Sequence, residues 1–570
     1  MRNRENHFMR VATRLFLVVL LGGVVGGLQI RGVHAQTKAQ AALSGQVSSS
    51  EEGLMEGVAV SAKKDGTTIA VTVYTDVQGR YRFPKDKLDA GHYAIKIRAA
   101  GYDLDSPSAV DVSAAGDVVA DIKLRKTANL AAQLTSAEWL DSMPGTPEQK
   151  APLRNCTTCH TLIRPLGSTH DADEFVAVQQ RMGTYVNQSI PLRPQIRLAA
   201  RLADQIESQG EDSLSRQASV VRKQAEFLAS VNLSSGPQYS YPLKTFPRPK
   251  GTATRALITE FDLPEKTRQP HDVYVDRDGI VWYISFGEQV LGRLDPKTGK
   301  VTEFEVPTLK PRSPKGELAL RPDEDGNLWV AMMYQGAVGK FDKKTEKFQT
   351  WSLPAELNKD YTQITEVNAT RSKVDGKVWI DDSGTYTLYR LDPVTGRFET
   401  FKPFPDPSPN VYDISPDPQN NVYFTVFGSN QIGRVDAKTG EITTYTTPTK
   451  GSNPRRGELD DKGMFWFGEF GGNRIGMFNT KNLSFKEWAP ASPWTFPYDV
   501  VADKDGTVWS GSTTTDRISR LDPKTGRIVE YLMPRDTNMR KIFVDNSTRP
   551  VTIWVGNTHG ASIIRMQLLD

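Results

Sequence analysis

The sequence is poor in cysteine and has no excess of charge of one sign. Only Cys156 and Cys159 occur among its 570 residues, so no disulfide framework can hold the chain together. Its 71 lysines and arginines nearly balance its 67 aspartates and glutamates, which gives a formal net charge of +4. Because no basic block stands out, we expect no nucleic-acid partner.

The sequence also lacks a long apolar run of the kind that spans a membrane. Its most apolar stretch, residues 15–30, contains four glycines and is shorter than the roughly 20 residues of a spanning helix. Arginines precede it and small residues follow it at 33–35, which is typical of a secretory signal peptide over residues 1–35. We expect cleavage, export to the periplasm or another extracytoplasmic location, and no stable membrane span. An uncleaved anchor is the alternative.

The two cysteines form one motif with the histidine that follows them. Cys156, Thr157, Thr158, Cys159 and His160 spell C-x-x-C-H, the attachment signature of a c-type haem. Two thiols one helical turn apart can join the vinyl groups of one haem, and the adjacent imidazole then reaches the iron. We predict one covalent haem c on Cys156 and Cys159, with His160 as the proximal iron ligand. A buried disulfide or a thioredoxin-like redox pair is the alternative, but no βαβ pattern surrounds the motif.

The residues around the motif, 135–235, change character and become helical. Apolar residues recur at helical spacing over 173–186 and 213–231. A helix before the motif, a methionine after it and a closing helix resemble a small class I cytochrome c domain. The resemblance implies Met182 as the distal iron ligand, on the helix face that buries apolar surface. Core packing of Met182, or ligation by His170 instead, are alternatives that the sequence leaves open.

Residues 42–125 alternate apolar and polar positions in short runs that end at turns. This period of two predicts half-buried antiparallel strands near 43–47, 58–62, 81–83, 93–97 and 118–122. The matching stretches are L-S-G-Q-V at 43–47, T-D-V-Q-G-R-Y-R-F at 75–83, G-H-Y at 91–93 and A-G-Y at 100–102. They resemble the carboxypeptidase regulatory-like domain, a small transthyretin-like β-sandwich. We assign no catalysis to this segment.

Self-similarity dominates the remainder, residues 256–570. An aromatic residue opens the second strand of each unit, at spacings of 43–50 residues: Trp282, Trp329, Trp379, Tyr423, Trp466, Trp509 and Trp554. Four short strands at this period predict the blades of a seven-bladed β-propeller. The seventh unit ends after its third strand, whereas a spare fourth-strand sequence stands at 257–263 before the first unit. We therefore expect the N-terminal strand to complete the last blade and close the ring.

The repeats carry short motifs of a known family. They read P-H-D-V at 270–273, D-G-I-V-W at 278–282, Q-I-G-R at 431–434 and W-F-G-E at 466–469. These resemble the virginiamycin B lyase, or streptogramin lyase, family of seven-bladed propellers, in which histidines and glutamates at the channel mouth carry a metal-assisted elimination. The resemblance implies a divalent metal in the channel and these candidate catalytic residues: His271, Glu317, Glu469 and His559. A set of polar residues that only lines a water-filled channel is the alternative.

The expected organisation is mainly β and multidomain, because 570 residues are too many for a single core. The predicted parts are a signal peptide (1–35), a β-sandwich (42–125), a helical cytochrome c-like haem domain (135–235), a linker (236–255) and the propeller (256–570).

Three functions fit these parts, and a fold alone does not choose among them. The first is haem-based electron transfer, in which the sandwich and propeller bind a redox partner protein or a small-molecule substrate, and oxidation of that substrate through the haem would make the protein an oxidoreductase. The second is a metal-dependent lyase at the propeller mouth, and the third is a cell-envelope binding module. Electron transfer is the function we expect, because it requires only the motif residues.

Overall fold

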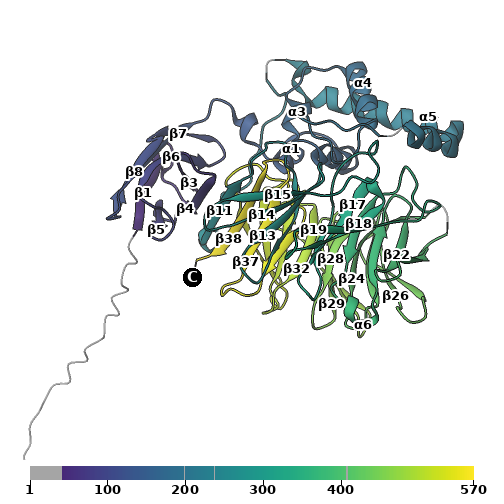
Figure 1. Cartoon of the computed structure of the whole chain (residues 1–570). Helices are drawn as coiled ribbons and strands as arrows, with labels where there is room; N and C mark the ends of the chain where they lie inside the picture. Colours follow the sequence, from purple (N-terminus) through teal and green to yellow (C-terminus); the bar gives the residue numbers. More distant parts are fainter. Residues whose placement is uncertain (1–40, 198, 237, 406–407, 570) are drawn as a thin grey trace, which may run out of the picture. The chain divides into compact units, whose positions relative to one another are not determined.

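The structure is a computed structural model that describes residues 41–197, 199–236, 238–405 and 408–569 (Figure 1). The predicted signal peptide lies outside the described residues. No helix in these ranges combines the length and the apolar character that a membrane crossing requires.

The N-terminal segment forms two β-sheets. Its strands are β1 (Ala41–Ser49), β2 (Gly53–Leu54), β3 (Ala59–Lys64), β4 (Ile69–Tyr74), β5 (Arg80–Pro84), β6 (Gly91–Arg98), β7 (Tyr102–Ser106), β8 (Ala109–Val112), β9 (Val118–Val119) and β10 (Ile122–Lys126). One sheet has the order β2-β1-β10-β7, with β5 and β9 also paired to β1, and the other contains β4-β3-β6-β8. The sequence prediction missed β2, β4, β7 and β8, and it gave a single strand where β9 and β10 are separate.

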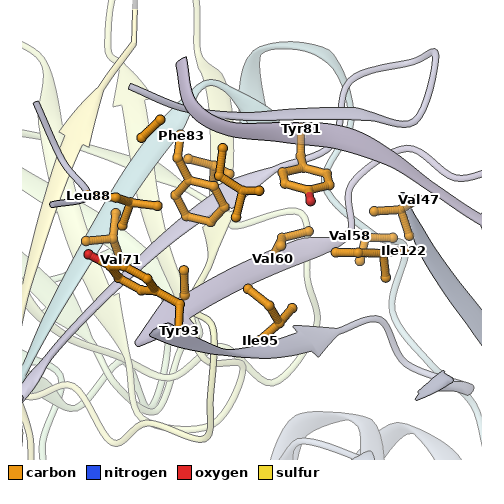
Figure 2. Packing of buried hydrophobic residues seen from close by; sticks show 14 of the residues in the cluster. Val47, Val58, Val60, Val71, Tyr81, Phe83, Leu88, Tyr93, Ile95 and Ile122 are labelled. Carbon is orange, nitrogen blue, oxygen red and sulfur yellow. The ribbon is translucent and has the colours of Figure 1, made fainter. Parts of the chain in front are cut away.

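The core of this sandwich is built from the inward-facing positions of the alternating runs. Figure 2 shows apolar side chains such as Val47, Val60, Phe83 and Ile122 gathered in one cluster, and these four are fully buried. In β5 the burial alternates strictly, with Tyr81 and Phe83 buried between exposed arginines. The period-two pattern therefore places one face of each strand in the core, as predicted.

A helical segment follows the sandwich. It comprises the 3-10 helices η1 (Leu130–Gln133), η2 (Ala151–Thr158), η3 (Leu233–Ser235) and η4 (Gly251–Thr254) and the α-helices α1 (Ser136–Ser142), α2 (Pro147–Lys150), α3 (Ile163–Leu166), α4 (Ala172–Gly183) and α5 (Ala199–Val231). Helix α1 begins with a capping box, in which Thr135 and Glu138 each bond the other's backbone N–H. Helix α5 begins well before the predicted residue 213, and Leu202 and Ile206 in its added part also stand at helical spacing, which the sequence prediction overlooked.

The C-terminal part consists of repeated four-stranded antiparallel sheets. Within the described residues, six complete units are β12–β15, β16–β19, β20–β23, β24–β27, β28–β31 and β32–β35, and a seventh contains β36, β37, β38 and β11. The aromatic residue that defined each repeat lies in the second strand of its unit, as predicted. The first strands contact one another in a closed order, from β12 through β36 and back to β12, so the units form a propeller-like ring.

The strands of the ring have these bounds: β11 (Ala256–Asp262), β12 (Pro270–Val275), β13 (Val281–Ser285), β14 (Val290–Leu294), β15 (Val301–Glu305), β16 (Leu320–Pro322), β17 (Leu328–Met332), β18 (Ala337–Asp342), β19 (Lys347–Ser352), β20 (Ile364–Asn368), β21 (Val378–Asp382), β22 (Thr387–Asp392), β23 (Arg397–Phe401), β24 (Asn410–Pro416), β25 (Val422–Phe427), β26 (Gln431–Val435), β27 (Ile442–Thr446), β28 (Pro454–Leu459), β29 (Met464–Glu469), β30 (Arg474–Asn479), β31 (Ser484–Trp488), β32 (Pro497–Ala502), β33 (Val508–Ser512), β34 (Arg517–Asp522), β35 (Arg527–Leu532), β36 (Ile542–Asp545), β37 (Thr552–Asn557) and β38 (Ser562–Leu568). Two short helices interrupt them: η5 (Met333–Gln335) and α6 (Ser372–Asp375).

A recurring aspartate in the turn before the second strand gives several of the repeats the same local structure. Asp276 accepts hydrogen bonds from the backbone N–H groups of residues 278 and 280 and from the indole of Trp282 at 2.9 Å. Asp503 makes the same three contacts with residues 505 and 507 and with Trp509. One carboxylate thereby closes the turn and fixes the aromatic side chain that packs between neighbouring sheets.

Strand β11 closes the ring. It runs antiparallel to β38 in a continuous register from Ala256 opposite Leu568 to Asp262 opposite Ser562, and Figure 1 shows the teal β11 beside the yellow β38. Its residues Leu257, Ile258 and Phe261 are buried. The predicted completion of the last unit by the N-terminal strand is confirmed.

The outer edge of β11 is also paired, which the sequence did not predict. Strand β4 of the sandwich runs antiparallel to it, with Val71 opposite Thr259. The sandwich sheet and the last sheet of the ring therefore form one eight-stranded sheet, and β11 has no free edge.

Charged side chains at the centre of the ring form one buried network. Arg456 on β28 is fully buried, and its guanidinium lies 2.9 Å from Glu366, 3.6 Å from Asp272 and 3.9 Å from Asp413. Burial alone would raise the pKa of Glu366, but the positive charges of Arg321 and Arg456 outweigh it and hold that pKa below its usual range. The three carboxylates come from the first strands of three other units, so Arg456 joins β12, β20, β24 and β28.

We predict that replacing β11 with a Gly/Ser stretch of equal length lowers the thermal unfolding midpoint sharply, because the change removes three buried apolar side chains and weakens pairing at both edges. The matched control is the same replacement of β19, an outermost strand that is largely exposed and closes no ring. A copy of residues 256–262 appended after residue 570 through a short turn should restore part of the loss. Equal midpoints for the β11 and β19 variants would contradict the closure role.

We predict that Arg456→Met destabilises the protein by about 3–5 kcal/mol, because buried carboxylates lose their partner. A carboxylate whose pKa is lowered by folding contributes stability above its unfolded pKa, and that contribution is lost as pH falls through the folded pKa. The deficit of the variant should therefore be largest near neutral pH and shrink below about pH 4. Denaturant unfolding at several pH values measures it, with Arg293→Met, which removes an exposed pair with Glu346, as the control. A deficit that does not change with pH would count against this role.

Candidate functional site

The C-x-x-C-H motif folds as a helical turn. Helix η2 ends at Thr158, and the backbone N–H groups of Cys159 and His160 both donate to the carbonyl of Cys156 at 3.3 Å. The two thiols therefore stand about one turn apart, with the imidazole directly after them. This is the local geometry that the spacing of the motif predicts.

Two side chains of the ring hold the backbone of the motif. The amide of Asn538 donates to the carbonyl of Thr157 at 3.0 Å, and the guanidinium of Arg540 donates to that of Thr158 at 2.8 Å. Arg540 is itself buried, and it lies over the ring of Phe286 at 4.3 Å. The residues between the two cysteines are thus fixed directly to the seventh unit.

His160 presents one ring nitrogen for coordination. Its Nδ1 lies 2.9 Å from the carbonyl of Thr161, and since a carbonyl can only accept, Nδ1 carries the proton. The lone pair is then on Nε2, the arrangement usual for metal-ligating histidines. Burial lowers the pKa of His160 and outweighs the carbonyl of Thr161, which acts to raise it.

The thiols do not have the properties of a redox pair. Burial raises the pKa of Cys156 to about 11 and also raises that of Cys159, although Arg540 acts in the opposite direction on Cys159. Reactive C-x-x-C pairs depend on a lowered thiol pKa. The thioredoxin-like alternative therefore finds no support in this environment.

A cavity of about 680 Å³ borders the motif, within the size range of roughly 300–1,000 Å³ typical of ligand sites. Cys159, His160 and Thr161 form part of its wall. The remainder comes from the sandwich, the ring, other residues of the helical segment such as Leu192, and the segment predicted as a linker, which contributes Phe246 and Pro247. That segment is packed here, since the backbone N–H of Phe246 donates to Glu138 at 2.6 Å.

The wall of the cavity combines apolar side chains with several cations and with the carboxyl groups of Glu138 and Asp536. Ile97, Leu192, Phe246 and Leu532 provide apolar surface. Among the cations, Arg98 pairs with Asp516 at 2.6 Å and Arg535 pairs with Glu260 at 2.7 Å.

Arg517, in contrast to these, has no carboxylate partner within ion-pair distance in the described part of the chain. Its terminal nitrogen donates to the carbonyl of Pro247 at 2.7 Å, and its buried Nε has no partner. Burial lowers the pKa of Arg517 from its usual value. A buried cation of this kind favours an anionic group on whatever fills the cavity.

The structure places Met182 away from this cavity. The predicted helix is present as α4, and Phe175 in its first turn is buried. The expectation that Met182 shares this burial is wrong, because its side chain is 38% exposed. Only the start of α4 meets the apolar cluster, and the last turn extends beyond it. His170 is also partly exposed, and its imidazole lies 3.4 Å from Glu174.

The four candidates from the ring do not form one site. His559 lines the cavity beside the motif, whereas His271, Glu317 and Glu469 do not. Those three are fully buried. Burial raises the pKa of Glu469 to about 8, with Glu487 acting in the same direction, and it raises that of Glu317 well above its usual range. Among the described residues, no group of three or more His, Cys, Asp and Glu side chains could hold a metal ion.

His271 belongs to a chain of buried hydrogen bonds at the ring's centre. Its Nδ1 lies 2.6 Å from Asp272, its Nε2 lies 3.3 Å from the hydroxyl of Tyr498, and that hydroxyl lies 2.6 Å from Tyr412. Residues of the helical segment cover this region, since Leu153 and Cys156 pack in the same apolar cluster as the two tyrosines. His271, Glu317 and Glu469 are therefore not exposed to solvent in this structure.

Sequence reasoning missed the residues that attach the motif to the ring. Asn538 and Arg540 directly precede the first strand of the seventh unit, at the position where other units carry His271 or Arg455. The repeat spacing could have placed them at the ring's mouth. No pattern within residues 150–160 indicates the contact itself.

Comparison with known families supports two of the predicted resemblances. Residues 42–125 match the carboxypeptidase regulatory-like domain, and residues 252–457 match the virginiamycin B lyase family. Neither matched range includes the C-x-x-C-H motif, so the cytochrome c resemblance stays a prediction. No curated protein sequence matches the chain.

Solved structures of similar shape include propellers from several sources. Virginiamycin B lyase from Staphylococcus aureus is 23% identical and covers 55% of this chain and 99% of its own, with a TM-score of 0.48. A streptogramin B lyase structure is also 23% identical and covers 56% of this chain and 100% of its own, with a TM-score of 0.49. The extracellular domain of a hybrid two-component system from Bacteroides thetaiotaomicron is 15% identical and covers 52% of this chain and 40% of its own, with a TM-score of 0.41. These likenesses say nothing about function. The chain thus combines a carboxypeptidase regulatory-like domain with a virginiamycin B lyase-like propeller region.

Proposed function

We propose that this protein is an exported c-type cytochrome that transfers electrons, with one haem attached through Cys156 and Cys159. The observation that carries the proposal is the tautomer of His160, a residue that borders the cavity. Its Nδ1–H is held by the carbonyl of Thr161, which leaves Nε2 as the coordinating atom. Export itself is proposed from the signal-peptide pattern of residues 1–35.

Most residues around the cavity suit a haem in composition, but Cys156 is not among them and packs instead in the apolar cluster that contains Tyr412 and Tyr498. A haem is an apolar macrocycle with anionic propionates, and the cavity offers apolar walls together with the unpaired Arg517. The orphaned Nε of Arg517 would gain an acceptor from such a carboxylate, which removes the cost of its burial. Cys156 and Cys159 would supply the covalent bonds and His160 the proximal nitrogen.

The protein's own groups would set the conditions for electron transfer. Haem iron, when bound, carries one electron between its ferric and ferrous states. His160 is held by Thr161, and the backbone of the motif is fixed by Asn538 and Arg540, so little rearrangement need accompany the change of charge. The electron would come from a reduced exported redox protein or a small reduced substrate and pass to an oxidised partner.

The lyase alternative is less well supported by the same geometry. His271, Glu317 and Glu469 are fully buried, and the helical segment covers the centre of the ring. A streptogramin-sized substrate would have no access to them. We therefore assign the ring a supporting role, in which it holds the motif and presents surface to a partner.

We predict that the full-length protein, expressed with haem-attachment machinery, carries one haem that resists acid-acetone extraction and is reversibly reduced. Cys156→Ser together with Cys159→Ser should abolish covalent haem while the circular dichroism of the sheets is kept, because the ring contains no cysteine. Haem staining after denaturing electrophoresis and mass spectrometry give the readout. His170→Ala, which changes an exposed histidine near the motif, is the control and should retain full haem content. Haem that extracts freely from the wild type, or none at all, would refute the proposal.

A further inference from the structure

Besides Cys159 and His160, the cavity is lined by a histidine from the ring. Thr558, His559 and Gly560 form the turn between β37 and β38, and all three border the cavity. We propose that His559 is the second axial ligand of the haem iron, so that the propeller region completes the iron's coordination. This inference rests on the proposed function, since it presumes the haem on the motif.

The turn that carries His559 is joined to the motif through a single residue. The backbone N–H of Thr558 donates to the carbonyl of Asn538 at 3.3 Å, and the side chain of the same Asn538 donates to Thr157 at 3.0 Å. Asn557 fixes the turn further, because its side chain donates to the carbonyl of Asp536 and accepts from the N–H of Gly560. One network of hydrogen bonds therefore connects the turn of His559 with the motif that contains His160.

The imidazole of His559 is a buried polar group without a partner. Both of its ring nitrogens are shielded from solvent, and neither has a hydrogen-bond partner among the described residues. Buried polar atoms almost always have a hydrogen-bond partner or a metal partner. Two nitrogens without a partner beside a cavity therefore indicate that a bound group supplies one. Coordination to a metal ion would satisfy one nitrogen and remove the cost of its burial.

The electrostatic setting keeps the His559 ring neutral, as a metal ligand must be. Burial lowers its pKa to about 3, and the charges of Arg540 and His160 act in the same direction. The carbonyls of Thr158 and Thr157 act to raise this pKa, but neither meets the geometry of a hydrogen bond with a ring nitrogen.

The other candidates for this position are placed less well. Met182 is 38% exposed on α4, and His170 lies next to Glu174 with a side chain that is 45% exposed. Neither lines the cavity that His160 borders. Of the two histidines, only His559 lines the cavity with both ring nitrogens buried and without a hydrogen-bond partner among the described residues.

Ligation by two histidines has consequences for function. It fills both axial positions of the iron, which leaves no site for oxygen or substrate and restricts the haem to passing electrons. A histidine in place of methionine also lowers the reduction potential, since methionine ligation raises it. The ring would then be needed for the haem's properties as well as for the position of the motif.

The test uses the full-length, haem-loaded protein and four variants: His559→Ala, His559→Met, Met182→Ala and His170→Ala. We expect the wild type to be low-spin, to show the near-infrared charge-transfer bands of two axial histidines and to be slow to bind cyanide. His559→Ala should open the iron to cyanide, and added imidazole should restore the low-spin spectrum. His559→Met should raise the midpoint potential and produce the sulfur-to-iron band of His/Met ligation. The other two variants should match the wild type.

The outcomes separate this inference from the proposed function. Covalent haem with a wild-type spectrum in His559→Ala, or with a spectrum that responds to Met182→Ala or His170→Ala, would overturn the assignment of His559 and leave the cytochrome intact. Absence of covalent haem in the wild type would instead refute the proposed function. If His559→Ala does not fold, the near-infrared bands of the wild type decide, because the signature of one histidine and one methionine would exclude His559.

Discussion

Strand β11 is paired along both of its edges, and the arrangement of the N-terminal parts depends on that pairing. On one side it completes the last sheet of the ring with β38, and on the other it continues into β4 of the sandwich. Every strand edge carries unsatisfied backbone groups that favour further pairing. By joining two such edges with one strand, the chain closes the ring and attaches the sandwich to it.

The helical segment lies between these two β parts in the sequence, and specific contacts hold it to the ring. Asn538 and Arg540 bind the backbone between the cysteines, while the apolar cluster around Trp139 and Leu153 includes Tyr412 and Tyr498 of the ring. These contacts join the C-x-x-C-H segment to the ring. In the proposed function the ring supports the motif, and the candidate residues His271, Glu317 and Glu469 at its centre are buried.

Much of this architecture follows from the sequence, because periodic patterns report local structure. The missing fourth strand of the last unit identified the closing role of residues 257–263, and the alternation in β5 located its buried face. Strand β4 was missed, since its continuous apolar run gives no period and its partner lies far along the chain.

Single polar contacts were the least predictable features of the site. Nothing in the local sequence marks Asn538 as the residue that joins the motif to the turn of His559, because one side chain in a loop carries no periodic signal. The helix that contains Met182 was predicted correctly. Helical spacing does not show how far along a helix the buried face extends, and Met182, in the last turn of α4, is exposed.

The central claim is that one iron lies between the motif and the ring. The most direct measurement is X-ray diffraction at the iron absorption edge from crystals of the exported, haem-loaded protein, because anomalous scattering locates iron without assumptions about its ligands. The account predicts a single iron site in the cavity, bonded to His160 on one side and His559 on the other. An iron bonded to Met182 or His170, or crystals of the mature protein without iron, would contradict it.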